Sequence, residues 1–335
     1  FLFILFIAVS TLAFMAIGIY APIILVGLQF TLILLSDRIV TRMGDWVVDI
    51  QRPNIHLLRY HIPMEEYRAF IQRCSLNLLL RIKREIYERT LALGRRLDHQ
   101  TACEVFSEHG FRLVPENLSV EVVPIYRLVE EAAERFKLPT PRIVISNTIT
   151  PNAAATGIGP GRGVILITTG LLVQLGEDEI LSVIGHELSH IKGRDPLILF
   201  ALTSSEYLLR VYLLWPIIAP FGLLYVMLTL GAIYFVAKFF EAKADLESAV
   251  RIGNPRALAE ALRKIGFRRL RFERIHAYRL QEWVGWDPHP PLYFRISRLE
   301  RLPTSVEARH LLLQSIRDVV RGFIHEVSSL FIHPR

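Results

Sequence analysis

The chain has 335 residues, a formal net charge of +7 at pH 7 and 52% hydrophobic residues, and its mean hydropathy is +0.35. The apolar residues are concentrated, because residues 1–36 and 211–237 carry no acidic or basic side chain. Two uncharged stretches of this length argue against a soluble protein and indicate membrane helices. The basic residues lie near these stretches, as the positive-inside rule requires, and no basic motif interleaved with aromatic residues indicates nucleic-acid binding. We therefore expect a lipid bilayer, and no nucleic acid, among the partners.

The N-terminal third divides into an apolar and a basic segment. Residues 1–36 are expected to form a transmembrane hairpin, because the Gly-Ile-Tyr-Ala-Pro sequence at 18–22 favours a turn. One long tilted helix is the second interpretation. Residues 37–112 are basic and mostly helical in pattern, and we interpret them as a juxtamembrane segment on the cytoplasmic side. The two cysteines of the chain, Cys74 and Cys103, lack the spacing of a thiolate metal site and favour a reducing compartment.

Residues 113–195 are expected to form the first part of a compact domain. Their pattern predicts a helix ending near 136, a strand at 142–146, an extended stretch at 150–157 and a second strand at 164–168. An amphipathic helix follows directly, because apolar residues recur at helical spacing between 177 and 191. This region therefore combines a small sheet with helices.

The predicted helix at 177–191 carries the sequence His186-Glu187-Leu188-Ser189-His190. On a helix, residues four apart lie on one face, so His186 and His190 can bind the same metal ion. Glu187 projects beside them and is placed to accept a proton from a metal-bound water. With eleven histidines in the chain, the pattern can also arise by chance, so the flanking sequence has to support it.

A second apolar segment, residues 196–240, follows the histidine motif. Pro216 and Pro220 bracket a turn, which predicts a hairpin of two passes, each about 20 residues long, the length needed to cross a bilayer. A hairpin that only dips into the membrane, or packs on protein, is the alternative. Glu206 and Arg210 lie four apart on the first pass, where they can form an ion pair.

Carboxylates for a third metal ligand begin immediately after this hairpin. Because two passes return the chain to its starting side, Glu241 can meet the histidine pair and complete a His₂Glu site. Asp245, one turn later, is expected to accept a hydrogen bond from a ligating imidazole. Glu247 is expected to have no influence on the metal. Residues 241–335 are thus expected to form the second part of the compact domain. The alternative is that Glu241 and Asp245 lie on a solvated face of a helix and bind no metal.

These blocks together resemble the integral-membrane zinc metallopeptidases of peptidase family M48, in the layout of its HtpX-like group. Residues 151–157 are similar to the edge-strand motif of the family, with Ala154 where an aromatic residue is usual. Residues 170–195 resemble its active-site helix, and Glu241 with Asp245 resembles its third-ligand motif. The sequences Gly253-Asn254-Pro255 and His289-Pro290-Pro291, the latter followed by Arg295, are similar to its C-terminal blocks. The resemblance runs from about 113 to 302, includes the flanking membrane hairpins and does not include 45–110.

The resemblance implies residue roles and a fold. It implies that Ala153, Ala154 and Ala155 pair with the substrate backbone, that Asn152 holds the substrate or the oxyanion, and that His289 stabilises the transition state. It also implies a structural role for Arg295. The expected fold is mainly α-helical with a small β-sheet, a zincin-like α+β domain, together with about four transmembrane helices in two hairpins.

The expected function is that of a membrane-bound endopeptidase that hydrolyses peptide bonds with one Zn²⁺ per chain. Its expected substrates are proteins or peptides, chiefly membrane proteins undergoing quality control. The expected location is a prokaryotic inner membrane with the catalytic domain in the cytoplasm, and the oligomeric state stays open. Two other functions remain: a CAAX prenyl-protein protease, a group that uses seven membrane helices, and a non-catalytic zinc-binding scaffold or regulator, which would have no use for Glu187.

Overall fold

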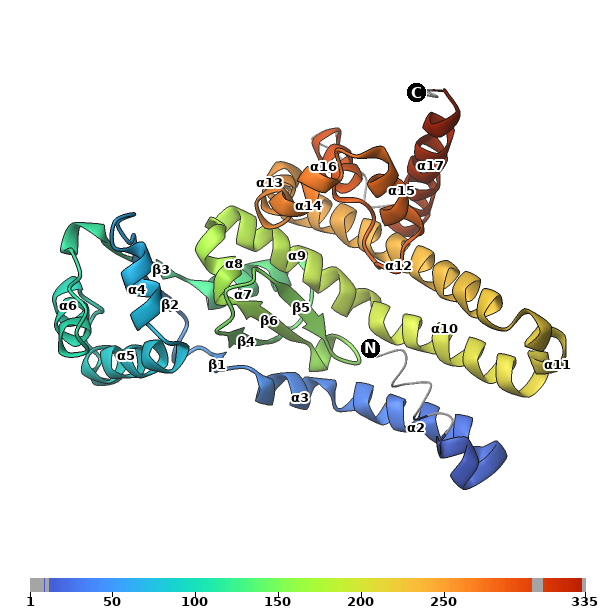
Figure 1. Cartoon of the computed structure of the whole chain (residues 1–335), viewed down its shortest axis with the longest axis horizontal. Helices are drawn as coiled ribbons and strands as arrows, with labels where there is room; N and C mark the ends of the chain where they lie inside the picture. Colours follow the sequence, from blue (N-terminus) through green and yellow to red (C-terminus); the bar gives the residue numbers. More distant parts are fainter. Residues whose placement is uncertain (1–8, 10–11, 303–309, 333–335) are drawn as a thin grey trace. The chain divides into compact units, whose positions relative to one another are not determined.

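The computed structural model describes residues 9, 12–302 and 310–332 (Figure 1). Its internal contacts divide the chain into two compact units. The larger unit combines Phe1–Gln51 with Tyr126–Arg335, and the smaller unit is Arg52–Ile125. Both are mainly helical with a small sheet, which confirms the predicted mixture of many helices and few strands.

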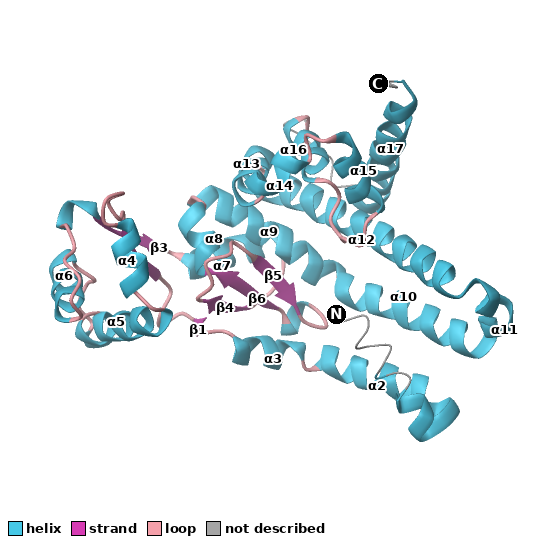
Figure 2. Ribbon diagram, viewed as in Figure 1, coloured by secondary structure: helices cyan, strands magenta, loops and turns pink. Residues whose placement is uncertain are grey.

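The larger unit contains a four-stranded sheet in the order β1-β4-β6-β5 (Figure 2). Strands β4 and β6 are parallel, whereas β1 pairs antiparallel with β4 and β5 pairs antiparallel with β6. Strand β4 contains the apolar sequence Ile143-Val144-Ile145, and all three residues are buried, as expected for a central strand. The strands are β1 (Trp46–Val48), β4 (Arg142–Ser146), β5 (Ala153–Thr156) and β6 (Val164–Thr168).

Helices cover this sheet and form the rest of the larger unit. Helix α9 packs against the edge strand β5 on one side and against the long helix α12 on the other. The helices are α2 (Ala21–Leu34), α3 (Ser36–Met43), α7 (Ile125–Phe136), α8 (Thr169–Gln174), α9 (Glu177–Gly193), α10 (Asp195–Leu209), α11 (Trp215–Ile218), α12 (Gly222–Ile252), α13 (Pro255–Ile265), α14 (Phe267–Phe272), α15 (His276–Val284), α16 (Leu292–Glu300) and α17 (Leu311–Ile332).

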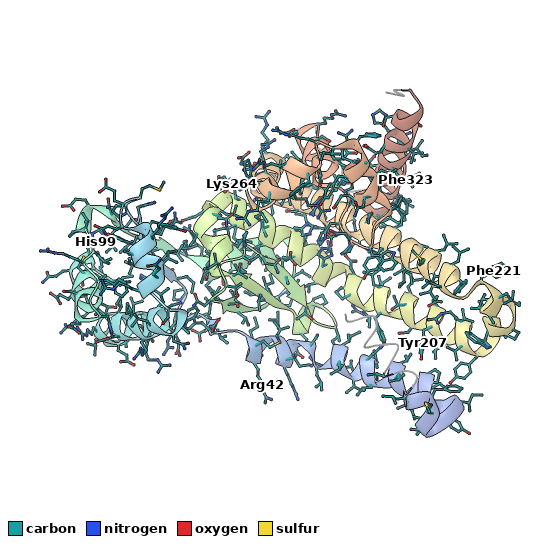
Figure 3. The ribbon with its side chains drawn as sticks, in the orientation of Figure 1. Arg42, His99, Tyr207, Phe221, Lys264 and Phe323 are labelled. Atoms are coloured by element: carbon teal, nitrogen blue, oxygen red, sulfur yellow. The ribbon has the colours of Figure 1, made fainter. Side chains whose placement is uncertain are left out.

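Two segments are long and apolar enough to cross a membrane, Leu12–Leu34 and Asp195–Ile252. The second reverses direction at α11, so α10 and α12 form the two legs of a hairpin (Figure 1). None of the residues in its most apolar 18-residue stretch is buried inside the protein. Figure 3 shows Phe221 at the tip of this hairpin and Tyr207 along α10. The side chains of this apolar stretch are therefore free to face lipid.

The first apolar segment differs in detail from the predicted hairpin. Among the described residues it is one candidate span, broken by the short 3₁₀ turn Gly18–Tyr20, where Gly18 has a φ of 59°. Most of the first half of the predicted hairpin lies outside the described residues. Helix α2 packs on α10, and the rings of Phe30 and Phe200 stack with centroids 5.9 Å apart. The described residues thus provide two candidate spans, the second of which folds into two legs, and the four transmembrane helices stay a prediction.

The smaller unit contains more strand than its periodicity predicts. Strand β2 (Ile55–Tyr60) pairs antiparallel with β3 (Leu118–Val123) over six residue pairs. Three helices pack around a separate hydrophobic core that includes Ile82, Val105 and Phe106: α4 (Tyr67–Arg73), α5 (Leu76–Arg89) and α6 (His99–Glu108). Because β3 pairs with β2, this unit extends to 125, beyond the boundary predicted at 112.

Candidate metal centre

The motif helix α9 is stabilised at its start and packed closely along its length. Its first turn carries Glu177, Asp178 and Glu179, and the Glu179 carboxylate accepts a hydrogen bond of 2.8 Å from the Gly176 N–H. Acidic groups at this end offset the helix dipole. Gly185 lets α12 approach, because a Cβ at this position would lie 2.6 Å from the Ile252 side chain. The next residue in the chain, His186, is therefore held close to α12.

Three side chains from α9 and α12 converge on one point. The Nε2 atoms of His186 and His190 are 3.2 Å apart. The Glu241 carboxylate faces both rings, with Oε2 3.4 Å from Nε2 of His186 and Oε1 3.4 Å from Nε2 of His190. All three ligand atoms lie within 4.8 Å of one another. The structure thus brings together the three residues that the sequence predicts as metal ligands.

A buried carboxylate and a buried guanidinium lie behind His186. Asp245 Oδ1 is 2.9 Å from Nδ1 of His186, an ion-pair distance, although Nδ1 itself has no partner in hydrogen-bonding geometry. The Asp245 carboxylate accepts two hydrogen bonds from Arg295, of 2.8 Å and 2.7 Å. Burial alone lowers the pKa of Arg295, but the carboxylates of Asp245, Glu241 and Glu187 outweigh burial and raise it. Arg295 therefore stays charged and fixes Asp245.

An equivalent pair lies behind His190. The ring N–H at Nδ1 of His190 donates to Asp195 Oδ2 over 2.9 Å, and both oxygens of Asp195 accept hydrogen bonds of 2.7 Å from Lys243. The backbone turns sharply between the two helices, since Arg194 has a φ of 52°. A side chain on Gly193 would overlap Asp195 and Lys243. This backbone turn therefore brings Asp195, the first residue of α10, back to the His190 ring near the end of α9.

The convergent group fits a divalent cation. With carboxylates beside both Nδ1 atoms, the ring protons lie on Nδ1, so both Nε2 atoms present lone pairs. Two lone pairs and a carboxylate facing one another repel unless a cation lies between them. Glu241 Oε2 is buried and has no hydrogen-bond donor. Burial lowers the pKa of His186, but Asp245 and Glu241 overcome this and raise it to about 10, so these carboxylates favour positive charge at the ring, supplied by a second proton or by the cation that would replace it.

His289 approaches the same group from the loop before α16. Its Nε2 lies 3.4 Å from Glu241 Oε2. Asp287 Oδ1 accepts hydrogen bonds of 2.8 Å from both the backbone N–H and Nδ1 of His289. Burial raises the pKa of Asp287, but these hydrogen bonds and the Arg269 guanidinium lower it well below its usual range. Asp287 is thus a charged acceptor that orients the His289 ring toward the centre.

The predicted substrate residues lie on the edge of the sheet next to α9. Ala153, Ala154 and Ala155 belong to β5, whose outer edge pairs with no strand among the described residues. Asn152 comes just before β5 and is exposed. Its backbone N–H donates to Thr168 Oγ1 over 2.8 Å. Within the described part of the chain, no hydrogen bond joins Asn152 to the three convergent ligands.

Several residues around the centre have contacts that were not predicted from the sequence. Glu247, for which the sequence predicts only that it has no influence on the metal, is buried and accepts hydrogen bonds from Ser189, Lys192 and Arg251. It stabilises the contact between α9 and α12 and does not face the ligands. Asp195 and Asp287 were not predicted to orient histidines. A signal existed for both, because each carboxylate lies within five residues of a site histidine.

Comparison with known proteins identifies relatives of this chain. Residues 123–302 match the model of peptidase family M48. A protein from Thermococcus kodakarensis named "Protease HtpX homolog" is 34% identical, over 59% of this chain and 79% of the relative. Proteins of the same name from Pyrococcus abyssi and Moorella thermoacetica are 32% and 30% identical, over 78% and 75% of their lengths and 59% and 56% of this chain. The matched segment contains every site residue from Asn152 to Arg295.

Proposed function

The chain belongs to peptidase family M48, as its motifs predict, and from this membership we propose that it is a membrane-bound zinc endopeptidase. The observation that carries the proposal is the convergence of His186, His190 and Glu241 within 4.8 Å. Two imidazoles and one carboxylate are a ligand set typical of catalytic zinc, which keeps a further position for water. We assign these three residues to one Zn²⁺ per chain.

The protein residues around the ion would divide the proton transfers between them. When bound, zinc would lower the pKa of a coordinated water to about 7 and polarise the substrate carbonyl. Glu187 would accept the proton of the attacking water and then donate it to the leaving amine. His289 would donate a hydrogen bond to the developing oxyanion, held in that orientation by Asp287.

The substrate would bind along the edge of the sheet. Strand β5 is an edge strand beside α9, so an extended peptide can add to it through backbone hydrogen bonds. Ala153, Ala154 and Ala155 would pair with this peptide. Their small side chains leave room for bulky substrate residues. Asn152, exposed at the start of the strand, would hold the peptide or the oxyanion.

We further propose four transmembrane helices in two hairpins, with the centre on the cytoplasmic face of a prokaryotic inner membrane. The support is the position of the ligands, since Glu241 follows Lys238, the first charged residue after the apolar stretch of α12. A rise of 1.5 Å per residue places Glu241 only about 5 Å along the helix from that charge. A centre so close to the bilayer suits membrane-protein substrates and a role in their quality control.

The test is hydrolysis of casein by the purified protein with its zinc content measured. Zinc-dependent hydrolysis that a chelator abolishes and added zinc restores supports the endopeptidase. Bound zinc without hydrolysis of any peptide would instead identify a scaffold. Cleavage restricted to prenylated peptides would identify a CAAX-type protease, although that group uses seven membrane helices and the described residues contain two candidate spans.

A further inference from the structure

Lys238 is a buried lysine that the proposed chemistry does not use. It lies on α12 and has no exposed surface. Its Nζ donates to the backbone carbonyls of Gly285, over 3.4 Å, and of Asp287. The loop residue between these two acceptors is Trp286. Lys238 therefore fixes the backbone on both sides of Trp286 against α12.

The position of Lys238 along the chain locates this loop relative to the bilayer. Residues 211–237 carry no charge, and Lys238 is the charge that ends the apolar stretch. From Gly222, the start of α12, to Lys238 is 16 residues, or about 24 Å of helix, which approaches the thickness of a hydrocarbon core of about 30 Å. The loop is thus attached to the helix at the level where the apolar stretch ends.

The loop exposes apolar side chains at this level. Val284 is 55% exposed and Trp286 is 50% exposed, although both follow the fully buried Trp283. Trp283 belongs to a buried cluster with Ala242 of α12, and its ring packs on those of Phe294 and Phe323, so the loop has a buried base and an exposed apolar tip. Tryptophan is enriched at membrane interfaces because its ring is apolar while its N–H is polar.

The neighbouring helix α14 adds aromatic and basic side chains. Arg269 joins it to the loop through an ion pair of 3.0 Å with Asp287. Two phenylalanines of α14, Phe267 and Phe272, are exposed. Three arginines of this region are also exposed and form no ion pair with any residue that the structure describes: Arg268, Arg271 and Arg274. Exposed aromatic residues mixed with unpaired arginines complement an anionic lipid surface.

We propose that Val284–Trp286 is a membrane-interface anchor, which inserts its apolar side chains between lipid headgroups while the exposed arginines 268, 271 and 274 contact anionic lipid. The proposal rests on the membrane location given under Proposed function. It carries a consequence for the centre, because Asp287 follows the anchor directly and orients His289. Only two residues, Asp287 and Pro288, separate Trp286 from His289, so contact of Trp286 with lipid is coupled to the position of the His289 ring.

Spin labels on the full-length protein test the anchor. Cys74 and Cys103 are replaced by serine, and single cysteines are introduced as Trp286→Cys, Arg256→Cys and Leu228→Cys. Arg256 is exposed on α13, and Leu228 is 66% exposed within the apolar stretch of α12. The protein is placed in nanodiscs of phosphatidylcholine with phosphatidylglycerol. The accessibility of each label to oxygen and to a water-soluble nickel chelate is then measured.

The label at 286 is expected to behave like that at 228, accessible to oxygen and protected from nickel, whereas the label at 256 shows the reverse. A label at 286 that matches 256 overturns the proposal. Protection accompanied by dipolar coupling between labels on two chains also overturns it, because a second copy then covers the loop. Val284→Cys provides a second label if Trp286→Cys does not fold. In pure phosphatidylcholine, or after replacing the three arginines with glutamine, the label at 286 should become more accessible to nickel.

These measurements separate the anchor from the enzyme. The depth of a label requires no turnover, so a protein without proteolytic activity still reports whether 286 contacts lipid. If the label at 228 is accessible to nickel, the membrane location in the proposed function is wrong. If 228 is in lipid and 286 is in water, only the anchor fails.

Discussion

The carboxylate of Asp195 lies 2.9 Å from Nδ1 of His190, although Asp195 begins the next helix. Lys243 fixes this carboxylate from α12, as Arg295 fixes Asp245 beside His186. Each predicted ligand histidine therefore has a carboxylate 2.9 Å from its Nδ1 atom, and each carboxylate has a buried cation. Such acceptors orient a ligating ring and increase its basicity, and their loss lowers metal affinity by roughly 10- to 100-fold.

Asp195→Asn should therefore reduce zinc affinity by roughly 10- to 100-fold, because the amide is a weaker acceptor for the His190 N–H and leaves Lys243 without its charge partner. Competition with a chromogenic chelator measures the change. Asp178→Asn, on the first turn of α9, is the matched control and should retain wild-type affinity. Equal affinities in all three proteins would contradict the orienting role of Asp195.

Gly193→Ala should reproduce much of this loss without changing any charge. The added methyl group would overlap the Asp195 carboxylate and the Lys243 amine, which must separate to admit it. Zinc affinity should fall while the helical content measured by circular dichroism is retained. Gly161→Ala is the control, since a Cβ there meets nothing within 4 Å. A Gly193 variant with normal affinity would show that the turn tolerates the displacement.

Glu187→Gln should keep zinc and the fold but lose proteolysis by several orders of magnitude, because the amide accepts no proton from water. Activity on a fluorogenic peptide and zinc content are measured on the same sample. Glu177→Gln, an exposed position on the same helix, should keep full activity. Near-native turnover by the Glu187 variant, with zinc present, is incompatible with the mechanism.

Three carboxylates of α12 should differ in a defined order of zinc loss. Glu241→Ala opens a coordination position and should lose the metal, and Asp245→Ala should lower affinity by roughly 10- to 100-fold. Glu247→Ala should keep zinc but lower the free energy of unfolding by about 1–3 kcal/mol, because Ser189 and Lys192 lose a buried acceptor. Chelator competition and chemical denaturation separate the two effects. Zinc loss in the Glu247 variant alone would mean that the third ligand is misassigned.

Topology can be tested with single cysteines in a protein lacking Cys74 and Cys103. Gly161→Cys and Arg256→Cys should react with a membrane-impermeant reagent from the cytoplasmic side, and Phe221→Cys, 61% exposed at the hairpin tip, from the opposite side. The arginine-rich flanks and the two legs of the hairpin predict this pattern. Labelling of Phe221 and Arg256 from the same side would show that the hairpin does not span the bilayer.

The ligands could be predicted because their geometry is local. His186 and His190 lie one turn apart whatever the tertiary structure, and the hairpin logic that places Glu241 depends only on an even number of passes. The strands Arg142–Ser146 and Val164–Thr168 were likewise evident from short apolar runs between turn residues. Only the prediction for Glu241 depended on a contact between distant segments, namely the return of the hairpin.

What could not be predicted depends on particular tertiary turns. Asp195 reaches His190 only because Arg194 adopts a left-handed conformation, which a non-glycine residue seldom does. The pairing of β2 with β3 was missed because its partners, such as Tyr60 and Leu118, are far apart in the sequence. The burial of Glu247 was not predicted either, because it depends on how α12 packs against α9.

The order of the ligands along the chain also governs when the centre can exist. His186 and His190 leave the ribosome before the apolar hairpin, and Glu241 leaves it afterwards, fifty-one residues later. A nascent chain that has not completed the hairpin therefore has two ligands of the three and cannot close the site. On the proposed function, a nascent chain therefore acquires its complete zinc site only after the whole apolar hairpin has been synthesised.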